Sequence, residues 1–213
     1  MFYFEDIARK RGCRLVAGVD EAGRGALAGP VMAAAVVLPE GALLPGLNDS
    51  KKLTPAKRDE LFDLIYARAI AVGVGYGDCE LVDRINILQA TLHAMKQAVE
   101  CLPHLPDFLL IDGISKIQMP IEQMTIKKGD SASASIAAAS IIAKVTRDRL
   151  MQSYDACFPG YGFAEHKGYG CKSHMDAIAR LGPSVQHRLT FRGVKEHVSG
   201  AGMPLREVGL LND

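Results

Sequence analysis

The sequence has little cysteine, no long apolar run and almost no excess of charge of either sign. Its five cysteines lie far apart and form no Cys-x-x-Cys pair, so we expect free thiols rather than a disulfide framework or a structural zinc site. No apolar run reaches the roughly 18–20 residues of a membrane helix, and no apolar segment of a signal peptide follows Met1. These absences predict a cytoplasmic protein without membrane contact. The net charge of +1 leaves the question of a nucleic-acid partner open.

The composition is that of an ordinary globular domain. The 213 residues are 48% hydrophobic and 23% charged, enough for one domain with a core and too few for two large ones. The chain contains no evident linker or internal repeat. We therefore predict a single domain over residues 1–213, with a core at about 14–155 and a C-terminal segment at about 156–213.

Five runs of apolar residues have the length and bounds of β-strands: residues 14–19, 31–38, 69–76, 107–112 and 122–126. Helices are predicted where apolar residues recur at steps of three and four, or where small residues form a long run: residues 54–68, 84–101, 131–151 and 172–181. This order of elements indicates the α/β class. We expect a mixed five-stranded sheet flanked by helices, with a small helical extension at the C-terminus.

Four carboxylates stand at the predicted ends of these elements. Asp20 and Glu21 end the first strand, Asp112 ends the fourth, and Asp130 opens the long helix. Strand ends and a helix start can meet at one edge of a sheet, where four negative charges would repel one another. Hard divalent cations, which prefer oxygen ligands, would neutralise them. Two such ions roughly 3.5–4 Å apart can support the hydrolysis of a phosphodiester.

Each carboxylate also has a purely structural interpretation. Asp112 before Gly113 is typical of a turn, and Asp130 could cap the helix that follows it. Both roles are compatible with metal binding, because a cap leaves one carboxylate oxygen free. Asp20 and Glu21 are harder to explain as structural residues, because two charges after a run of buried apolar residues need a partner.

Two further segments could contact a ligand. Gly23 and Gly25 allow positive φ and a close approach of the backbone, and Arg24 between them suits a phosphate or a sugar hydroxyl. The alternative is a plain tight turn. Residues 166–197 hold four of the six histidines and more Lys and Arg than Asp and Glu. With Tyr169, this local basic surface fits a nucleic-acid track; the alternative is a solvated face with a packed tyrosine.

Seven motifs occur along the chain, and several of them are long: VAGVDEAGRGALAGPV at 16–31, NDSKKL at 48–53, LLIDG at 109–113, KKGD at 127–130, SIAAASIIAKVTRD at 135–148, HKGYG at 166–170 and HRLTF at 187–191. In this order, and over nearly the whole chain, they resemble ribonuclease HII, the type 2 ribonuclease H family. The resemblance implies a ribonuclease H-like fold. It also implies an endonuclease that hydrolyses the RNA strand of RNA–DNA hybrids and cuts 5′ to single ribonucleotides in duplex DNA, leaving 5′-phosphate and 3′-hydroxyl ends.

The resemblance assigns roles to particular residues. It implies a catalytic site of four carboxylates with Mg²⁺ or Mn²⁺, two ions acting together; its residues are Asp20, Glu21, Asp112 and Asp130. It implies that Gly23, Arg24 and Gly25 contact the 2′-hydroxyl of the ribonucleotide. It also implies that Lys51 binds a phosphate and that Tyr169 contacts the sugar at the RNA–DNA junction. The expected partners are RNA–DNA hybrid and ribonucleotide-containing duplex DNA, bound by a monomer whose C-terminal segment contacts the substrate.

The chain departs from the family pattern at Cys171, where the family commonly has Thr. A thiol is a weaker hydrogen-bond partner than a hydroxyl, so the departure bears on a local bond near Tyr169. The few residues before Asp20 leave no room for the N-terminal substrate-binding domain of the sister type, ribonuclease HIII.

Three other functions fit the residues less well. A junction resolvase or a type 1 ribonuclease H would not need the Gly-Arg-Gly turn or the His-Lys-Gly-Tyr segment. A non-catalytic nucleic-acid-binding module has no reason to place four negative charges beside phosphates, and it would bind no metal there. A small-molecule phosphohydrolase would need a closed pocket rather than an open basic track.

Overall fold

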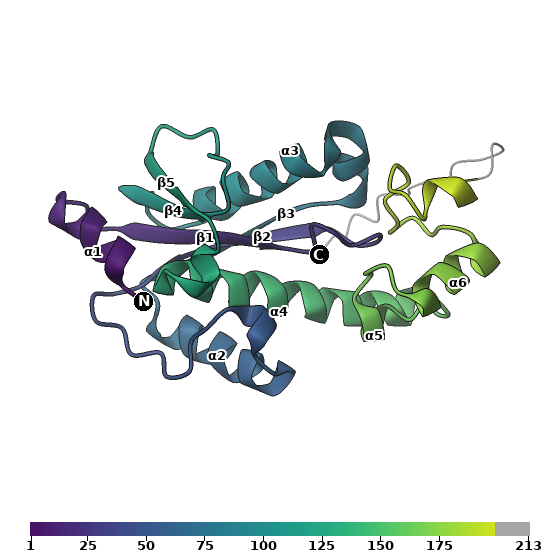
Figure 1. Cartoon of the computed structure of the whole chain (residues 1–213), viewed down its shortest axis with the longest axis horizontal. Helices are drawn as coiled ribbons and strands as arrows, with labels where there is room; N and C mark the ends of the chain where they lie inside the picture. Colours follow the sequence, from purple (N-terminus) through teal and green to yellow (C-terminus); the bar gives the residue numbers. More distant parts are fainter. Residues whose placement is uncertain (199–213) are drawn as a thin grey trace.

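The computed structural model describes residues 1–198 and contains a mixed β-sheet with helices on both faces (Figure 1). Its elements are α1 (Tyr3–Lys10), β1 (Val16–Ala22), β2 (Val31–Val37), α2 (Pro55–Arg68), β3 (Ala71–Gly77), α3 (Cys79–Glu100), β4 (Phe108–Asp112), β5 (Glu122–Ile126), α4 (Ala134–Cys157), α5 (Phe163–His166) and α6 (Lys172–Leu181), with short 3-10 turns η1 (Ser50–Lys52), η2 (Gly129–Ser131) and η3 (Lys195–His197). The predicted α/β class, five-stranded mixed sheet and helical C-terminal extension are confirmed. The predicted C-terminal segment at about 156–213 is described as far as residue 198.

β1 lies at the centre of the sheet, whose strand order is β3-β2-β1-β4-β5. β2 runs antiparallel to both β1 and β3, whereas β4 is parallel to both β1 and β5. In the parallel pair Val19 stands beside Ile111. Asp20 and Asp112 are the next residues of the two strands, so this register brings them to the same edge of the sheet.

The helices lie unusually close to the sheet because glycines face them. A Cβ on Gly18 of β1 would lie 2.1 Å from the carbonyl carbon of Ser135 in α4, and one on Gly73 of β3 would lie 2.1 Å from the carbonyl oxygen of Ala98 in α3. Real side chains do not tolerate such distances. The alanine- and serine-rich sequence of α4 and the sheet glycines therefore let two backbones meet, as the composition of the long helix predicts. α3 covers one face, while α2 and α4 cover the other (Figure 1).

Asp20 and Glu21 lie at the end of the first strand, as predicted, but the strand itself ends three residues later than the predicted residue 19. β1 continues to Ala22, so both carboxylates lie within it. Successive side chains of a strand point to opposite faces. Asp20 therefore faces α4, as Gly18 does, while Glu21 faces α3 and lines a hollow with residues of that helix.

The prediction that Asp130 opens the long helix is wrong. Asp130 lies in η2, and α4 begins later, at Ala134. The helix is capped by Ser133, whose hydroxyl oxygen accepts a hydrogen bond from the backbone N–H of Ile136 at 3.2 Å. The Asp130 carboxylate is consequently not used as the cap of this helix.

α1 is missing from the predicted elements, and it fixes the start of α4. Glu5 is completely buried; its Oε1 accepts hydrogen bonds from the Ser133 hydroxyl at 2.6 Å and the backbone N–H of Ser135 at 2.8 Å. The first N–H groups of a helix lack intrahelical partners and attract negative charge. Glu5 satisfies this need, and so holds the helix start beside the turn that carries Asp130.

α3 begins earlier than the apolar periodicity predicts. It starts at Cys79 and contains a break at Asn86, whose φ of 69° is left-handed. The Asn86 side chain accepts hydrogen bonds from the backbone N–H groups of Leu88 and Gln89, so it caps the second part of the helix. None of the helices in residues 1–198 combines the length and the apolarity that a membrane crossing requires.

Candidate active site

Asp20 is the most deeply buried of the four predicted carboxylates, with 3% of its surface exposed. Its Oδ1 accepts a hydrogen bond from the backbone N–H of Glu21 at 2.7 Å, and the Ser140 hydroxyl of α4 also donates to it. Burial raises the pKa of Asp20 well above its usual range, and the nearby charges of Glu21 and Asp112 raise it further. The protein itself therefore leaves much of this negative charge uncompensated.

Glu21 lies on the other side of β1 and has an exposed cation beside it. Arg24 Nη1 lies 3.7 Å from Glu21 Oε1. Burial raises the pKa of Glu21; Arg24 acts in the opposite direction, and the Asp112 charge raises it again. Glu21 and Asp112 also line the same hollow of about 250 Å³ beside α3.

Asp112 connects β4 to the turn that holds Asp130. Its Oδ1 accepts a hydrogen bond from the backbone N–H of Gly129 at 2.6 Å. The adjacent Asp130 is buried, and Lys51 Nζ lies 3.5 Å from its Oδ2. Burial raises the pKa of Asp130, as do the charges of Asp49 and Asp112, while Lys51 lowers it. The structure thus brings all four predicted carboxylates to one edge of the sheet.

The carboxylate set fits divalent cations in ligand type and in charge. Its oxygens are ligands that Mg²⁺ and Mn²⁺ prefer, and burial and mutual repulsion raise the pKa of Asp20, Glu21 and Asp130. In residues 1–198, no three acidic, histidine or cysteine side chains lie close enough together to hold an ion as they stand. Repulsion between uncompensated carboxylates opposes a tighter arrangement.

The Gly-Arg-Gly turn follows β1 and is held by two buried arginines. Arg188 donates hydrogen bonds to the backbone oxygens of Gly23 (2.8 Å) and Arg24 (2.9 Å). Arg147 donates to the backbone oxygen of Lys167 at 2.9 Å, and to two further backbone oxygens in the segment after the turn. Both arginines are completely buried. Each is a rigid fork of donors that fixes backbone oxygens and so shapes the loop.

The two glycines of the turn have different reasons to be glycine. Gly23 has a φ of 87°, and a Cβ there would lie 2.0 Å from Nε of Arg147. Gly25 lies outside the left-handed region, and a Cβ there would meet no atom within 4 Å. The positive φ that both glycines allow is therefore used only at Gly23. The fold requires a glycine at 23 but not at 25.

Sequence reasoning did not single out Arg147 and Arg188, although one signal was available. Arg147 lies seven residues after Ser140, two helical turns along the buried face of α4. A charged residue on an apolar face of a helix needs partners.

Arg188 was assigned to a basic surface together with His174 and His187, and this is wrong because all three are buried. Lys172, Arg180, Arg192 and Lys195 are exposed, as a basic surface requires.

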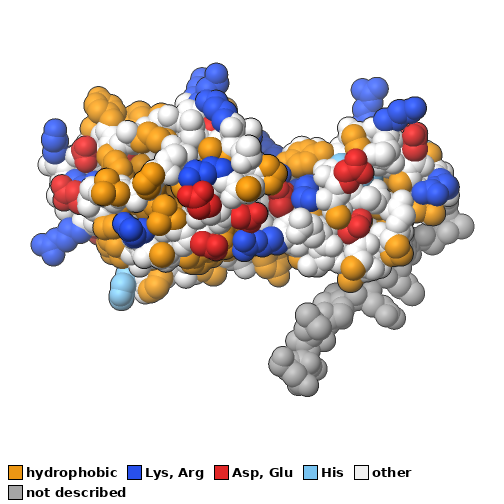
Figure 2. All heavy atoms as spheres, turned by 90° about the horizontal axis from the view of Figure 1, so that it is seen from below, with side chains coloured by type: hydrophobic (Ala, Val, Ile, Leu, Met, Phe, Trp, Pro, Cys, Tyr) orange, Lys and Arg blue, Asp and Glu red, His pale blue; other side chains and the backbone are white. Residues whose placement is uncertain are grey.

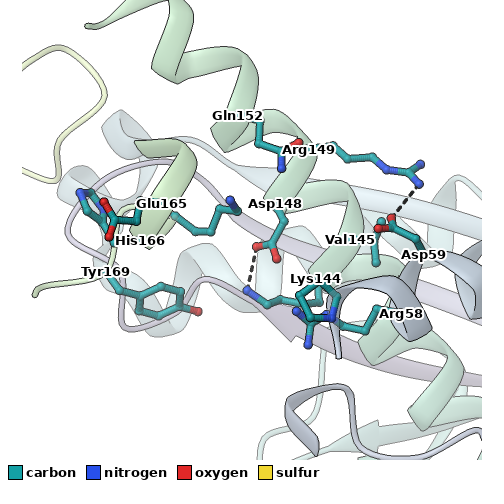
Figure 3. A pocket seen from close by; sticks show the side chains of 12 residues that line it. Arg58, Asp59, Lys144, Val145, Asp148, Arg149, Gln152, Glu165, His166 and Tyr169 are labelled. Carbon is teal, nitrogen blue, oxygen red and sulfur yellow. Dashed lines mark hydrogen bonds and ion pairs between the residues drawn. The ribbon is translucent and has the colours of Figure 1, made fainter. Parts of the chain in front are cut away.

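Tyr169 lies where three hollows meet. The first, of about 470 Å³, contains the Gly-Arg-Gly turn, Glu21 and Lys51. The second, of about 640 Å³, runs between α2, α4 and α5 (Figure 3), and the third, of about 740 Å³, lies toward α6 and η3. The ring is 38% exposed, with the Arg147 guanidinium 5.4 Å and Lys144 Nζ 5.8 Å from its centroid. Tyr169 is consequently a surface feature and not a core residue.

The hollow between α2 and α4 carries charges of both signs. Lys144 pairs with Asp148 at 2.7 Å, and Arg149 pairs with Asp59 at 3.0 Å. Figure 3 shows the first pair within α4 and the second between α4 and α2, and Figure 2 shows acidic and basic side chains mixed over the face seen from below. A uniformly basic track is therefore absent from this face of residues 1–198.

Lys51 and Cys171 lie beside the site. The Lys51 side chain is 79% exposed; desolvation lowers its pKa, but the charges of Asp130, Asp20 and Asp49 outweigh this and raise it.

Cys171 occupies the cap position of α6 without a side-chain cap, and its Sγ lies 3.1 Å from Ser173 Oγ. A threonine hydroxyl is a good cap and a thiol is a poor one, so Cys171 leaves the start of α6 without a side-chain cap.

Comparisons with known proteins find relatives in both sequence and structure. The family described as Ribonuclease HII matches residues 17–194. Ribonuclease HII of Geobacter sulfurreducens is 69% identical over 195 residues, which cover 92% of this chain and 90% of that protein. The crystal structure of ribonuclease H2 from Pyrococcus horikoshii has a TM-score of 0.71 at 25% identity, covering 86% of this chain and 96% of that chain. Bst ribonuclease HIII in complex with Mn²⁺ has a TM-score of 0.64 at 19% identity, covering 86% and 68%, and shows the shared fold.

Proposed function

The chain belongs to the ribonuclease HII family, and from that premise we propose how its residues recognise and cut a substrate. It is a type 2 ribonuclease H, a hydrolase that cleaves RNA within RNA–DNA hybrids. We propose that it also cuts duplex DNA on the 5′ side of a single embedded ribonucleotide, and that it acts as a monomer in the cytoplasm.

Asp20, Glu21, Asp112 and Asp130 are proposed to hold two Mg²⁺ or Mn²⁺ ions. The support is their position at one sheet edge and the raised pKa of Asp20, Glu21 and Asp130; the related Bst enzyme binds Mn²⁺. When bound, such ions activate a water molecule for attack on phosphorus and stabilise the leaving oxygen, which gives 5′-phosphate and 3′-hydroxyl ends.

Lys51 contacts Asp130, and we propose a second role for it as a phosphate-binding residue. Its Nζ is 3.5 Å from the Asp130 carboxylate, but the side chain is 79% exposed and free to move. At this distance and exposure the ion pair is weak, because water solvates the ammonium group. The ammonium group is then available to a substrate phosphate in the hollow that Lys51 lines with the Gly-Arg-Gly turn.

The observation that carries ribonucleotide recognition is the open space at Gly25. No atom of the described protein would meet a Cβ at this position, and its backbone conformation is available to any residue. A glycine that the fold does not require is explained by a ligand that approaches the backbone closely. The 2′-hydroxyl is the group that distinguishes RNA from DNA, and it both donates and accepts hydrogen bonds. Backbone groups at 23–25 can satisfy it in both roles.

Tyr169 is proposed to contact the sugar on the 3′ side of the ribonucleotide. It borders the hollow that contains the Gly-Arg-Gly turn and the two that lie beyond it, so its ring stands between neighbouring parts of a bound strand. A deoxyribose leaves room for an aromatic ring, whereas an added hydroxyl crowds it. The ring therefore favours DNA on the 3′ side of the ribonucleotide, while the glycine turn requires RNA at the nucleotide that directly follows the cut.

A duplex with one embedded ribonucleotide tests this function. In Mg²⁺ or Mn²⁺ we expect one cut on the 5′ side of the ribonucleotide, with 5′-phosphate and 3′-hydroxyl products. EDTA should abolish the reaction, and the same duplex with deoxyribose throughout should remain intact. Full activity in EDTA, or products with a 2′,3′-cyclic phosphate, would contradict the metal mechanism. Degradation of continuous hybrid with no cut at the single ribonucleotide would instead be type 1 behaviour.

Gly23→Ala and Gly25→Ala form a matched pair that separates fold from recognition. Gly23→Ala forces a left-handed alanine against Arg147, which three hydrogen bonds hold in place, so unfolding should become easier by roughly 2–4 kcal/mol. Gly25→Ala should leave the melting temperature unchanged, because its Cβ meets only solvent. It should nevertheless reduce kcat/KM on the single-ribonucleotide duplex by tenfold or more, on the order of one lost hydrogen bond to a buried group. Wild-type cleavage by Gly25→Ala would exclude backbone recognition at this turn.

A further inference from the structure

Three histidines form a buried cluster beneath the turn that carries Tyr169. His174 and His187 are fully buried, and the His166 ring stacks on that of His174 with their centroids 4.3 Å apart. Phe163 of α5 contacts all three rings. Each ring nitrogen of the cluster has a hydrogen-bond partner, so the cluster is a connected polar network inside the C-terminal segment.

The partners of His174 and His187 determine where each proton is. His174 Nδ1 lies 3.0 Å from the carbonyl oxygen of Tyr169, which can only accept, so Nδ1 carries a proton. His187 Nδ1 lies 2.9 Å from the backbone N–H of Ser184, which can only donate, so this nitrogen is unprotonated. In the neutral rings, His187 Nε2–H must therefore donate to His174 Nε2, 3.1 Å away.

His166 is ordered by the same logic. Its Nδ1 accepts from the backbone N–H of Gly168 at 3.2 Å, so Nε2–H donates to the carbonyl oxygen of Tyr161 at 2.8 Å. Every proton has one consistent place when all three rings are neutral. Burial supports this state: desolvation lowers the pKa of His174 to about 4 and that of His187 to about 3. A fully satisfied buried network of this kind strengthens each of its bonds and holds its members rigidly.

The chain of donors runs in one direction, from Ser184 through His187 and His174 to the backbone of Tyr169. We propose that His174, with its proton held on Nδ1 by His187, is a positioning residue that fixes the Tyr169 turn for substrate binding. The inference rests on the proposed contact of Tyr169 with the substrate. It concerns how the fold holds the ring in place, since His174 lies beneath the turn and contacts its backbone oxygen.

Two substitutions at position 174 separate positioning from packing. In His174→Asn the amide nitrogen replaces Nδ1 and can still donate to the Tyr169 carbonyl, whereas in His174→Gln the amide reaches His187 but not Tyr169. We expect His174→Gln to raise KM for the single-ribonucleotide duplex by roughly three- to tenfold, the effect of one hydrogen bond. Its kcat and Mn²⁺ affinity should stay unchanged, and His174→Asn should keep a near wild-type KM. If His174 only fills space, His174→Asn should be the more damaging variant, because the smaller side chain leaves the larger cavity. A KM that rises more in His174→Asn than in His174→Gln, or equally in both, would overturn the proposal.

Nitrogen NMR of the histidine rings in the wild-type protein gives a test without substitutions. At neutral pH we expect His174 to be protonated on Nδ1, and His187 and His166 on Nε2. A charged His174, or one protonated on Nε2 alone, would overturn the proposal whatever the variants do. Tyr169→Ala, measured in the same binding assay, distinguishes the proposed substrate contact of Tyr169 from the positioning role of His174. If it binds the duplex as wild type does, the role of Tyr169 is wrong and the positioning role falls with it. If Tyr169→Ala binds the duplex more weakly but His174→Gln and His174→Asn have the same KM, only the proposed role of His174 is wrong.

Discussion

Asp20→Asn is expected to lower kcat on RNA–DNA hybrid and on the single-ribonucleotide duplex by on the order of 10³-fold or more. Charge stabilisation by bound metal is worth several kcal/mol, and each ~1.4 kcal/mol is a factor of ten in rate. Asparagine keeps the size of the side chain and an oxygen that accepts from the Glu21 N–H, so the fold should survive. Single-turnover cleavage at saturating Mg²⁺ measures the effect, and an unchanged circular dichroism spectrum is the control. Cleavage within tenfold of the wild-type rate would exclude Asp20 as a metal ligand.

Thermal melting of Asp112→Asn is the companion measurement for this site. The amide oxygen can still accept the hydrogen bond from Gly129, while the negative charge that raises the pKa values of Asp20, Glu21 and Asp130 is removed. Without metal the variant should therefore melt no lower than wild type, and it should gain less from added Mg²⁺, because a ligand that binds the folded state more weakly stabilises it less. A large loss of metal-free stability would instead identify Asp112 as a structural turn residue.

Tyr169→Ala is expected to raise KM for the single-ribonucleotide duplex by roughly tenfold to a hundredfold. Aromatic contacts to nucleic acid are worth about 1–3 kcal/mol by alanine substitution, and ~1.4 kcal/mol is a factor of ten. Stability should change little, because the ring is more than a third exposed, and metal affinity should not change. Preference for the single-ribonucleotide duplex over continuous hybrid should fall, since the ring is the feature proposed to favour DNA on the 3′ side of the ribonucleotide.

Tyr169→Phe is the matched control for this experiment. It keeps the ring that packs on the sugar and removes only the hydroxyl, so we expect KM close to that of wild type. A loss of all activities in Tyr169→Ala together with a marked fall in melting temperature would show that the ring acts in packing. Equal defects in the Phe and Ala variants would transfer the role from the ring to the hydroxyl.

The sequence by itself determined the fold class and the candidate residues. Short apolar runs identified all five strands, and the helix predicted at 54–68 agrees with α2, which Thr54 caps. These signals are local: they depend on which side chains can be buried along one element, and neighbouring residues contain that information. Motif order along the chain supplied the family and the four carboxylates.

The arrangement of the site was decided only by tertiary structure. The parallel register of β1 and β4 brings Asp20 beside Asp112, and Glu5 of an unpredicted helix caps α4 across a separation of more than a hundred residues. Arg188 was interpreted as surface, because a charged residue in isolation favours water; three backbone carbonyls that converge from the Gly-Arg-Gly turn and its surroundings are what make its burial stable. Such partners lie far away in the chain, and no local pattern contains them. The difference between Gly23 and Gly25 has the same origin, since it depends on whether Arg147 occupies the space that a Cβ would fill.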